Sequence, residues 1–350
     1  MLTRREFCAG AAAGAVATRT AFGQTKATPS IEDFFSEFAD EWVSISPGFA
    51  TSQRYFTGAK QDQLERTLAP YTLAESKKTI ALAKKGLGQL RAFDRAKLTD
   101  KQKLWADVVD WQLAIVVEEE PYLDYSFPLQ QMNGFNVNIV ERFTVGRPMT
   151  KPRDAENYVA ALGQVSLRMD EAIAESKRLA AKGILPPTFI LQATLKQMRS
   201  FVDPAPASNP FVTSFAEKVV AIKDLTPEKQ TQLRAETEKI VGTKIYPSWK
   251  AAIATLDSQV PKSTNDAGLW RLKGGPEAYK FFLRRYTTTN LTADEIHEIG
   301  LRKVTELEKQ MDTLLRQIGR TNGTVNERVE KLRLDCSIRI RRRRPAANRS

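Results

Sequence analysis

The sequence has few of the side chains on which many catalytic and metal sites depend. Its 350 residues include two cysteines, Cys8 and Cys336, which lie near the two ends, and one histidine, His297. The body of the chain therefore has no thiol for a disulfide or a cysteine-based metal site. One imidazole excludes a site with several histidine ligands and disfavours a Ser-His-Asp or Cys-His arrangement. His297-Glu298 begins a zinc-binding helix motif, but Leu301 stands where the second histidine belongs.

Long apolar runs and regular strand patterns are scarce as well. After the N-terminal segment no run of about 18 apolar residues occurs, so we expect no transmembrane segment in the mature chain. Period-two alternation is rare, which disfavours a large sheet, although residues 135–145 could form a short strand or an irregular loop. Hydrophobic residues make up 42% of the chain and charged residues 27%, proportions that predict a folded globular protein.

The first 23 residues resemble a twin-arginine export signal. Arg4 and Arg5 are followed by Glu6 and Phe7, and a mildly apolar Ala/Gly stretch continues to Ala17. Small residues at positions 21 and 23 suit cleavage before Gln24. We therefore expect recognition by the twin-arginine export machinery and an exported, periplasmic or extracytoplasmic location. The other interpretation is an alanine-rich first helix with a basic start.

Capping patterns and apolar periodicity predict an all-α, multi-helix array. Thr72, Thr99 and Thr292 each precede a Glu or Gln by three residues, the spacing of a capping box. Thr226 is followed by proline at the first helical position, where the missing N–H costs nothing. The expected helices cover about residues 31–45, 73–93, 100–119, 153–181, 187–202, 209–222, 227–257, 276–286 and 293–318.

The segment 293–318 has the most regular apolar pattern. Six residues recur at alternating steps of four and three and form one stripe: Gly300, Val304, Leu307, Met311, Leu314 and Ile318. We interpret this stripe as a packing face of the core, because Met and Leu at helical spacing seldom form a cofactor site.

The formal charge of +12 is concentrated at the two ends. Residues 1–28 carry +3 and residues 333–350 carry +6, which leaves +3 for the chain between them. Nucleic-acid binding needs cations clustered on a folded face. Because the charge lies mostly at the two ends, its distribution disfavours nucleic-acid binding as the main function.

Two loop regions are candidates for lining a cleft. Residues 121–134 mix aromatic residues with Pro, Gln and Gly, and residues 274–292 begin with a glycine pair. The candidate cleft-lining residues are Gln130, Gln131, Asn133, Gly134, Tyr279 and Thr289. Glu118-Glu119-Glu120 at a helix end is either a cation or peptide-amine site or a solvated acidic end.

Several segments, in the same order and with similar spacing over about residues 30–332, resemble the bacterial family called domain of unknown function 885. They include Phe127-Pro-Leu-Gln-Gln-Met-Asn-Gly134, Asp154-Ala-Glu-Asn-Tyr158, Lys182-Gly-Ile-Leu-Pro-Pro187, Tyr246-Pro247 and Thr287-Thr-Thr-Asn-Leu-Thr-Ala-Asp-Glu-Ile-His-Glu-Ile-Gly300. Members of this family are exported or membrane-attached helical proteins that look like zinc metallopeptidases, and the resemblance implies peptides as substrates.

The family pattern continues beyond what this chain contains. A His-Glu-x-x-Pro-Gly-His segment and a later Glu-Gly-Trp-Ala motif would supply the metal ligands and the general base, and neither occurs here. The resemblance therefore assigns no catalytic, metal or cofactor residue to this chain, and zinc would belong to a full-length relative. We expect the N-terminal part of an exported peptidase-like protein, inactive alone. The other hypothesis is a non-enzymatic periplasmic helical binding module.

The last 18 residues differ in composition from the rest. Arg, Pro, Ala and Ser dominate after about residue 333, as in a GC-rich gene read out of frame. The expected organisation is a signal peptide over 1–23, an incomplete helical family domain over 24–332 and a disordered basic tail over 333–350. We expect this tail to come from a frameshift or a truncation; a genuine basic tail for anionic partners is the alternative.

Overall fold

The computed structural model describes residues 30–343, and every regular element within them is a helix or a helical turn. The predicted all-α array is therefore confirmed. Arg4 and Arg5, like the rest of the expected signal peptide, lie outside the described residues. None of the helices within 30–343 has the length and apolarity that crossing a bilayer requires.

The α-helices follow one another with short connections, several of which contain 3₁₀ turns. They are α2 (Ile31–Ser44), α3 (Pro47–Gln53), α4 (Gly58–Glu65), α5 (Leu73–Arg91), α6 (Asp100–Glu118), α7 (Phe135–Thr144), α8 (Pro152–Leu162), α9 (Val165–Ala181), α10 (Thr188–Val202), α11 (Pro210–Val219), α12 (Pro227–Ile240), α13 (Tyr246–Gln259), α14 (Gly275–Thr287), α15 (Ala293–Gln317) and α16 (Val325–Arg343).

The capping residues begin helices where the sequence predicts. Thr99 and Thr292 form complete capping boxes at the starts of α6 and α15. Thr72 accepts a hydrogen bond from the amide of Glu75 at the start of α5, and Thr226 accepts one from the amide of Lys229 at the start of α12. These local bonds satisfy amides that have no partner inside the helix.

Three expectations about single segments need correction. Residues 135–144 form α7 instead of a strand or loop, because Phe135, Ile139 and Phe143 recur at helical spacing and all three are buried. The helix expected over 153–181 is two helices. Between them the side-chain amide of Gln164 binds the carbonyl of Arg66 and the amide of Leu68, and so holds this point of the chain against another segment.

The helix expected over 227–257 is also interrupted. A π-helical segment, Val241–Ile245, lies between α12 and α13. Pro247 follows it, and because proline has no N–H, it cannot continue the regular α-helical ladder through this point. The short helices α3 and α4 and the last helix α16 were not among the predicted ranges.

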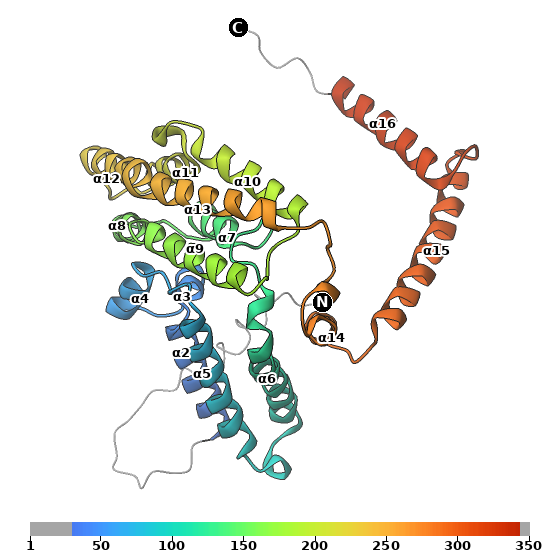
Figure 1. The fold of residues 1–350 in the computed structure, drawn as a ribbon, viewed down its shortest axis with the longest axis horizontal. Helices are drawn as coiled ribbons and strands as arrows, with labels where there is room; N and C mark the ends of the chain where they lie inside the picture. Colours follow the sequence, from blue (N-terminus) through green and yellow to red (C-terminus); the bar gives the residue numbers. More distant parts are fainter. Residues whose placement is uncertain (1–29, 344–350) are drawn as a thin grey trace. The chain divides into compact units, whose positions relative to one another are not determined.

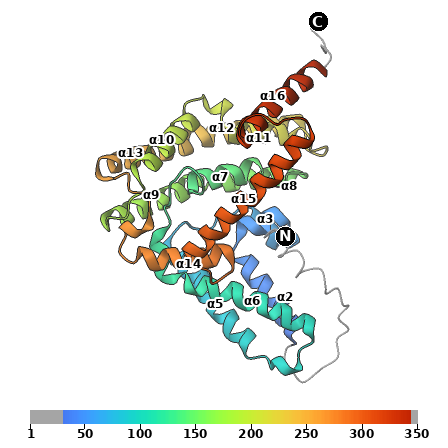
Figure 2. The same cartoon turned by 90° about the vertical axis from the view of Figure 1, so that its right-hand side faces the viewer.

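The chain forms two compact units that divide between Lys273 and Gly274. The division falls just before α14. In the first unit, α10 to α13 form one layer over α7, α8 and α9 (Figures 1 and 2). This layer pair encloses the larger apolar core, whose fully buried aromatic residues include Phe143, Tyr158, Phe211, Phe215 and Trp249.

A second apolar core lies between α2, α5 and α6 of the same unit. Its buried members include Phe34 and Phe38 of α2, Leu82 of α5 and Leu113 of α6. The Phe38 ring lies 5.6 Å from the Phe34 ring and 5.9 Å from the Trp42 ring. Gly86 of α5 is buried against the Phe38 ring, and a Cβ atom at position 86 would lie 2.3 Å from the Phe38 Cε2 atom. The missing side chain therefore lets α2 and α5 approach closely.

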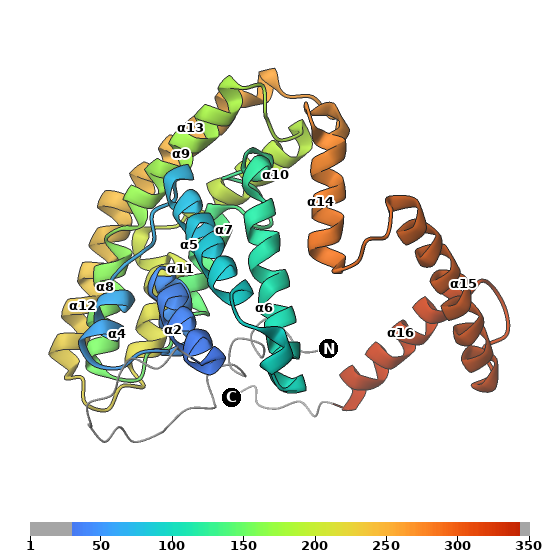
Figure 3. The ribbon, with the colours of Figure 1, turned by 90° about the horizontal axis from the view of Figure 1, so that it is seen from below.

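The second unit contains α14, α15 and α16, of which α15 packs on α16 (Figure 3). Leu315 is the buried side chain of α15, and the buried Arg328 of α16 lies 2.5 Å from the Asp312 carboxylate. The α15 stripe, defined as Gly300, Val304, Leu307, Met311, Leu314 and Ile318, lies beside Leu315, which is one residue after Leu314 and four after Met311. Its five apolar side chains are 37–61% exposed, so the expectation that this stripe is part of the core is wrong.

The helix α16 continues through Arg343. The composition change near residue 333 therefore lies inside a helix, and residues 333–343 of the expected disordered tail are described as helical. Residues 344–350 lie outside the described residues.

The two glycines of α5 provide a matched test of the α2–α5 packing. Gly86→Ala should lower the free energy of unfolding by about 1–3 kcal/mol, because its methyl group must displace the enclosed Phe38 ring. Gly88 is exposed with open space around it, so Gly88→Ala should raise the free energy of unfolding by about 0.5–1 kcal/mol. Urea unfolding of both variants measures the two effects. A stabilising Gly86→Ala substitution would contradict the close approach.

Candidate functional site

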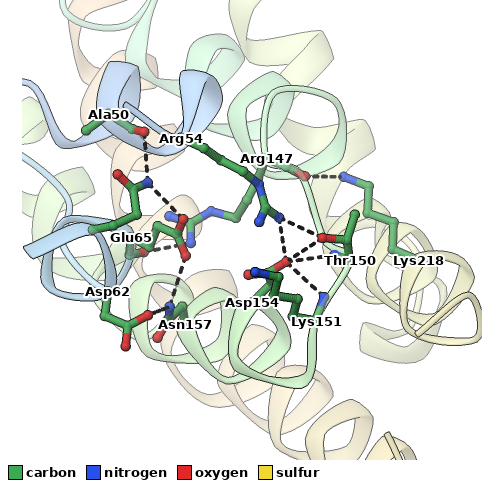
Figure 4. A network of polar contacts seen from close by, with 11 residues as sticks. Ala50, Arg54, Asp62, Glu65, Arg147, Thr150, Lys151, Asp154, Asn157 and Lys218 are labelled. Carbon is green, nitrogen blue, oxygen red and sulfur yellow. Dashed lines mark hydrogen bonds and ion pairs between the residues drawn. The ribbon is translucent and has the colours of Figure 1, made fainter. Parts of the chain in front are cut away.

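The most developed polar arrangement of the described residues is a group of buried side chains between α4 and α8 (Figure 4). We call it the polar clamp. It consists of Gln61 and Glu65 on α4, Arg147 before α8, Asp154 and Asn157 on α8, and Arg54 after α3. The first five of these residues are at most 8% exposed. Buried charged groups destabilise the fold unless they are paired, so the loss of any contact in this group should lower the stability.

Asp154 anchors one side of the polar clamp. Its Oδ2 atom accepts hydrogen bonds from the amide nitrogens of Thr150 and Lys151, at 2.7 and 3.0 Å, and from the Arg54 guanidinium at 2.5 Å. Burial acts to raise the pKa of Asp154, but these donors outweigh it and hold the pKa of this carboxyl below its ordinary value. The local cause is simple, because Asp154 lies at the third position of a helix that begins with Pro152.

Glu65 anchors the other side. Its carboxylate accepts one hydrogen bond from Gln61 on its own helix, at 2.9 Å, and one from Asn157 on α8, at 3.0 Å. The backbone carbonyl of Glu65 accepts a hydrogen bond from the Arg147 guanidinium at 2.7 Å. Gln61 also donates to the Ala50 carbonyl of α3. One residue of α4 thus connects three segments of the chain.

Arg147 is 3% exposed, and burial lowers its pKa to about 10 while the nearby Glu65 acts in the opposite direction. The side chain therefore remains charged at neutral pH. Its Nε atom and the Oδ1 atom of Asn157 are buried without a hydrogen-bond partner among the described residues. Lys218 of α11 donates to the carbonyls of Phe143 and Arg147, so the segment after α7 is held from a second side.

The polar clamp is suited to holding helices rather than to reacting with a substrate. Both carboxylates serve as acceptors for donors of the protein itself, and the arginines are among those donors. Sequence reasoning did not identify this group, because its members are brought together across 82 to 100 positions of the chain. The one local signal was Asp154 two residues after Pro152, inside a segment that also carries the family resemblance.

The candidate cleft-lining residues fall into two groups. Gln130, Gln131, Asn133 and Gly134 share the loop before α7. There the backbone N–H of Gln130 donates to the side-chain oxygen of Asn136, and the backbone carbonyl of Asn133 accepts a hydrogen bond from the side chain of Asn138. A Cβ atom at Gly134 would lie 2.3 Å from the Gln130 nitrogen, so this tight turn requires glycine.

The loop before α7 is also tied to α10. Asn136 donates to Gln197 at 3.2 Å, and Gln197 in turn approaches the Gln131 carbonyl at 3.5 Å. The Gln131 Oε1 atom is buried without a hydrogen-bond partner among the described side chains. The loop is thus held in place by hydrogen bonds, and the exposed Met132 lies at its tip.

Tyr279 and Thr289 belong to the second unit. Tyr279 on α14 is 48% exposed, and the Thr289 hydroxyl lies 2.9 Å from that of Thr287. A cleft lined by both groups of candidates therefore stays a prediction.

The remaining candidates lie on helix ends. His297 is exposed on the second turn of α15. At the end of α6, the Glu120 carboxylate lies 2.6 Å from the Lys84 ammonium, and this hydrogen bond lowers the pKa of Glu120. The family resemblance implies zinc for a longer relative. Among the described residues 30–343, no three His, Cys, Asp or Glu side chains are grouped so that they could hold a metal ion.

The polar clamp predicts a stability difference that depends on pH. Asp154→Asn should lower the free energy of unfolding by about 2 kcal/mol at pH 7, because the charge that receives the Arg54 and amide donors is removed. The matched control is Asp107→Asn in the exposed pair with Arg95, which should change stability by less than about 1 kcal/mol.

The sign of the pH effect follows from the lowered pKa. The contribution of Asp154 is fully present above its unfolded-state pKa of about 3.9 and is lost as the pH falls through the lower folded-state value. Urea unfolding at pH 7 and at low pH should therefore show the difference between wild type and Asp154→Asn shrinking on acidification. A difference that stays the same or grows in acid would refute the assignment.

Comparisons with known proteins give a consistent result. A family model described as "Bacterial protein of unknown function (DUF885)" matches residues 47–348. The crystal structure of "the putative lipoprotein from Colwellia psychrerythraea" is similar to this chain, with a TM-score of 0.74 and 20% sequence identity. The match covers 85% of this chain and 54% of that one, so this chain spans about half the length of the crystal structure. No curated protein matches the chain.

Proposed function

Because this chain belongs to the DUF885 family of bacterial proteins, we propose that it forms the helical, non-catalytic scaffold part of an exported, peptidase-like protein. The observation that carries this proposal is the polar clamp. Its buried carboxylates, Glu65 and Asp154, are both used to fasten helices to one another, which is what a rigid scaffold requires. The peptidase-like character rests on the resemblance of the quoted segments to the family, and the substrates would be peptides.

Two features support export. The Arg4-Arg5 segment has the pattern of a twin-arginine signal, and the similar crystal structure is described as that of a "putative lipoprotein", a class of protein found outside the cytoplasm. We place the working location of the protein in the periplasm or on the outer side of the membrane.

We also propose that the catalytic residues of such a peptidase-like protein lie outside these 350 residues. The one histidine of the chain is exposed on α15, far in sequence from both carboxylates of the polar clamp. A zinc centre of the kind that the family resemblance implies needs several nitrogen or carboxylate ligands around the metal.

A second candidate function is a non-enzymatic helical binding module. The observation that favours it is the exposed α15 stripe, because contiguous apolar side chains on a soluble surface mark sites of association. Such a module would bind a polypeptide and release it unchanged.

Both candidates predict no turnover by the purified chain. Incubation with a mixed peptide library, with and without added zinc, should leave the peptides intact when they are analysed by mass spectrometry. Cleavage that a chelator abolishes would overturn the scaffold proposal. A rise in the thermal midpoint with peptide concentration, without cleavage, would favour the binding module, because a ligand that binds only the folded state stabilises it.

A further inference from the structure

Three cationic side chains near the end of α7 have no carboxylate partner, and we call them the cation cluster. They are Arg142 in the last turn of α7, Arg147 just after this helix, and Lys218 of α11. Lys218 donates to the carbonyls of Phe143 and Arg147, and Arg147 donates to the carbonyl of Glu65 (Figure 4). No ion pair joins any of the three to a carboxylate of the described chain. A buried charge without an opposite charge destabilises a fold, so this region calls for a negative charge.

Arg142 has the fewest contacts of the cation cluster. Its side chain is half-buried, burial lowers its pKa, and its guanidinium has no hydrogen-bond acceptor among the described residues. The guanidinium lies against Gly48 of α3, where a Cβ atom would be 2.6 Å from both Cζ and Nη1 of Arg142. The missing side chain at Gly48 therefore makes room for a guanidinium whose N–H donors are unused.

Arg147 supplies a second positive charge near Arg142. The two residues are five positions apart across the end of α7, and the charge of Arg142 acts to lower the pKa of Arg147. Arg147 is 3% exposed, and its Nε atom is buried without a hydrogen-bond partner in the part of the chain that the structure describes. A buried donor of this kind indicates an ion or an ordered water beside it.

The carboxylates of the neighbouring polar clamp are already in use. Asp154 is paired with Arg54, and the Glu65 carboxylate accepts hydrogen bonds from two side-chain amides. These two carboxylates lie among four cations, namely Arg54 and the cation cluster. An ordered water would satisfy the Arg147 Nε–H group but would add no negative charge, whereas an anion supplies both an acceptor and the charge.

We infer that Arg142 and Arg147 bind a small oxyanion with the size and charge of phosphate or sulfate. The guanidinium group suits this ligand, because its planar fork of N–H donors matches two oxygens of an oxyanion. A free ion is favoured over a side chain of another protein, because Arg147 is enclosed and a large partner would not reach it. The inference does not depend on the scaffold proposal, because anion binding and peptide cleavage are measured separately.

Isothermal titration calorimetry of the full chain with sodium phosphate, in Hepes buffer at constant ionic strength, tests the inference. We expect saturable binding of one phosphate per chain, with sulfate competing for the same site. Arg142→Gln should raise the dissociation constant by at least about tenfold, because it removes charge-assisted hydrogen bonds to the anion. The matched control is Arg95→Gln, which removes an exposed arginine that is paired with Asp107 and should leave the dissociation constant unchanged.

Gly48→Ala tests the position of the guanidinium without removing a charge. The new methyl group would lie 2.6 Å from the Arg142 Cζ atom, so the flexible arginine side chain must move away. We expect a several-fold rise in the dissociation constant for phosphate. Circular dichroism checks that this variant and Arg142→Gln stay folded.

The thermal midpoint of Arg142→Gln distinguishes anion binding from a structural role of the arginine. In phosphate-free buffer the variant should unfold at a higher temperature than wild type, because it lacks an uncompensated half-buried charge. Phosphate should raise the midpoint of wild type more than that of the variant, because a ligand that binds only the folded state stabilises it. The general stabilising effect of phosphate salts acts on both chains equally and cancels in this comparison.

Three results would overturn the inference. The first is the absence of saturable binding of phosphate and sulfate. The second is binding that Arg142→Gln and Gly48→Ala both leave unchanged, because the anion would then lie elsewhere. The third is an Arg142→Gln variant that is less stable than wild type by the same amount with and without phosphate, because Arg142 would then only support the fold.

Discussion

The hydrogen bonds that Glu65 accepts from two helices are the constraint on which the rest of the first unit depends. Its carboxylate joins Gln61 of α4 to Asn157 of α8, and its carbonyl receives the buried Arg147. The helices α3 and α4 follow directly from α2, which belongs to the smaller apolar core, whereas α8 belongs to the larger one. The polar clamp is therefore one of the places where the two apolar cores are joined, and the ion pairs of Asp124 with Arg178 and Lys182 of the α9 segment are another.

Apolar burial and polar pairing have different roles in this arrangement. The two cores supply most of the driving force for folding, since burial of aromatic and aliphatic side chains is favourable in many relative positions. Directional hydrogen bonds to Asp154 and Glu65 allow fewer positions, and breaking one of them would leave a buried charge without its partner. The polar clamp thus fixes how the layers meet, and this rigidity is what the scaffold proposal requires.

The parts of the fold that the sequence predicted are those that depend on neighbouring residues. The Thr99 and Thr292 capping boxes act over three residues, and the apolar period of α15 acts over a few turns. The break at Gln164, by contrast, depends on backbone atoms almost one hundred residues away, and the contact between Arg147 and Glu65 spans 82 residues. Pairing over such distances has no signal in a local pattern.

The α15 stripe is a second example of what a local sequence pattern does not predict. Its amphipathic period correctly predicted a helix with one apolar face, but a period does not reveal which surface covers that face. For the candidate site, the loop residues Gln130 to Gly134 lie together because they are adjacent in sequence, and their role in lining a cleft stays a prediction. Their relation to Tyr279 and Thr289 would depend on contacts between distant segments, and the polar clamp was missed for the same reason.

Native-state hydrogen exchange of the full chain carrying Arg147→Met tests the role of the polar clamp most directly. The account predicts that amides of α4 lose at least about tenfold protection through local opening, while amides of α13, deep in the larger core, keep theirs. Unchanged protection of α4 would contradict the account, because α4 would then be held in place without Arg147. An equal loss in α4 and α13 would contradict it as well, since Arg147 would then stabilise the whole unit uniformly.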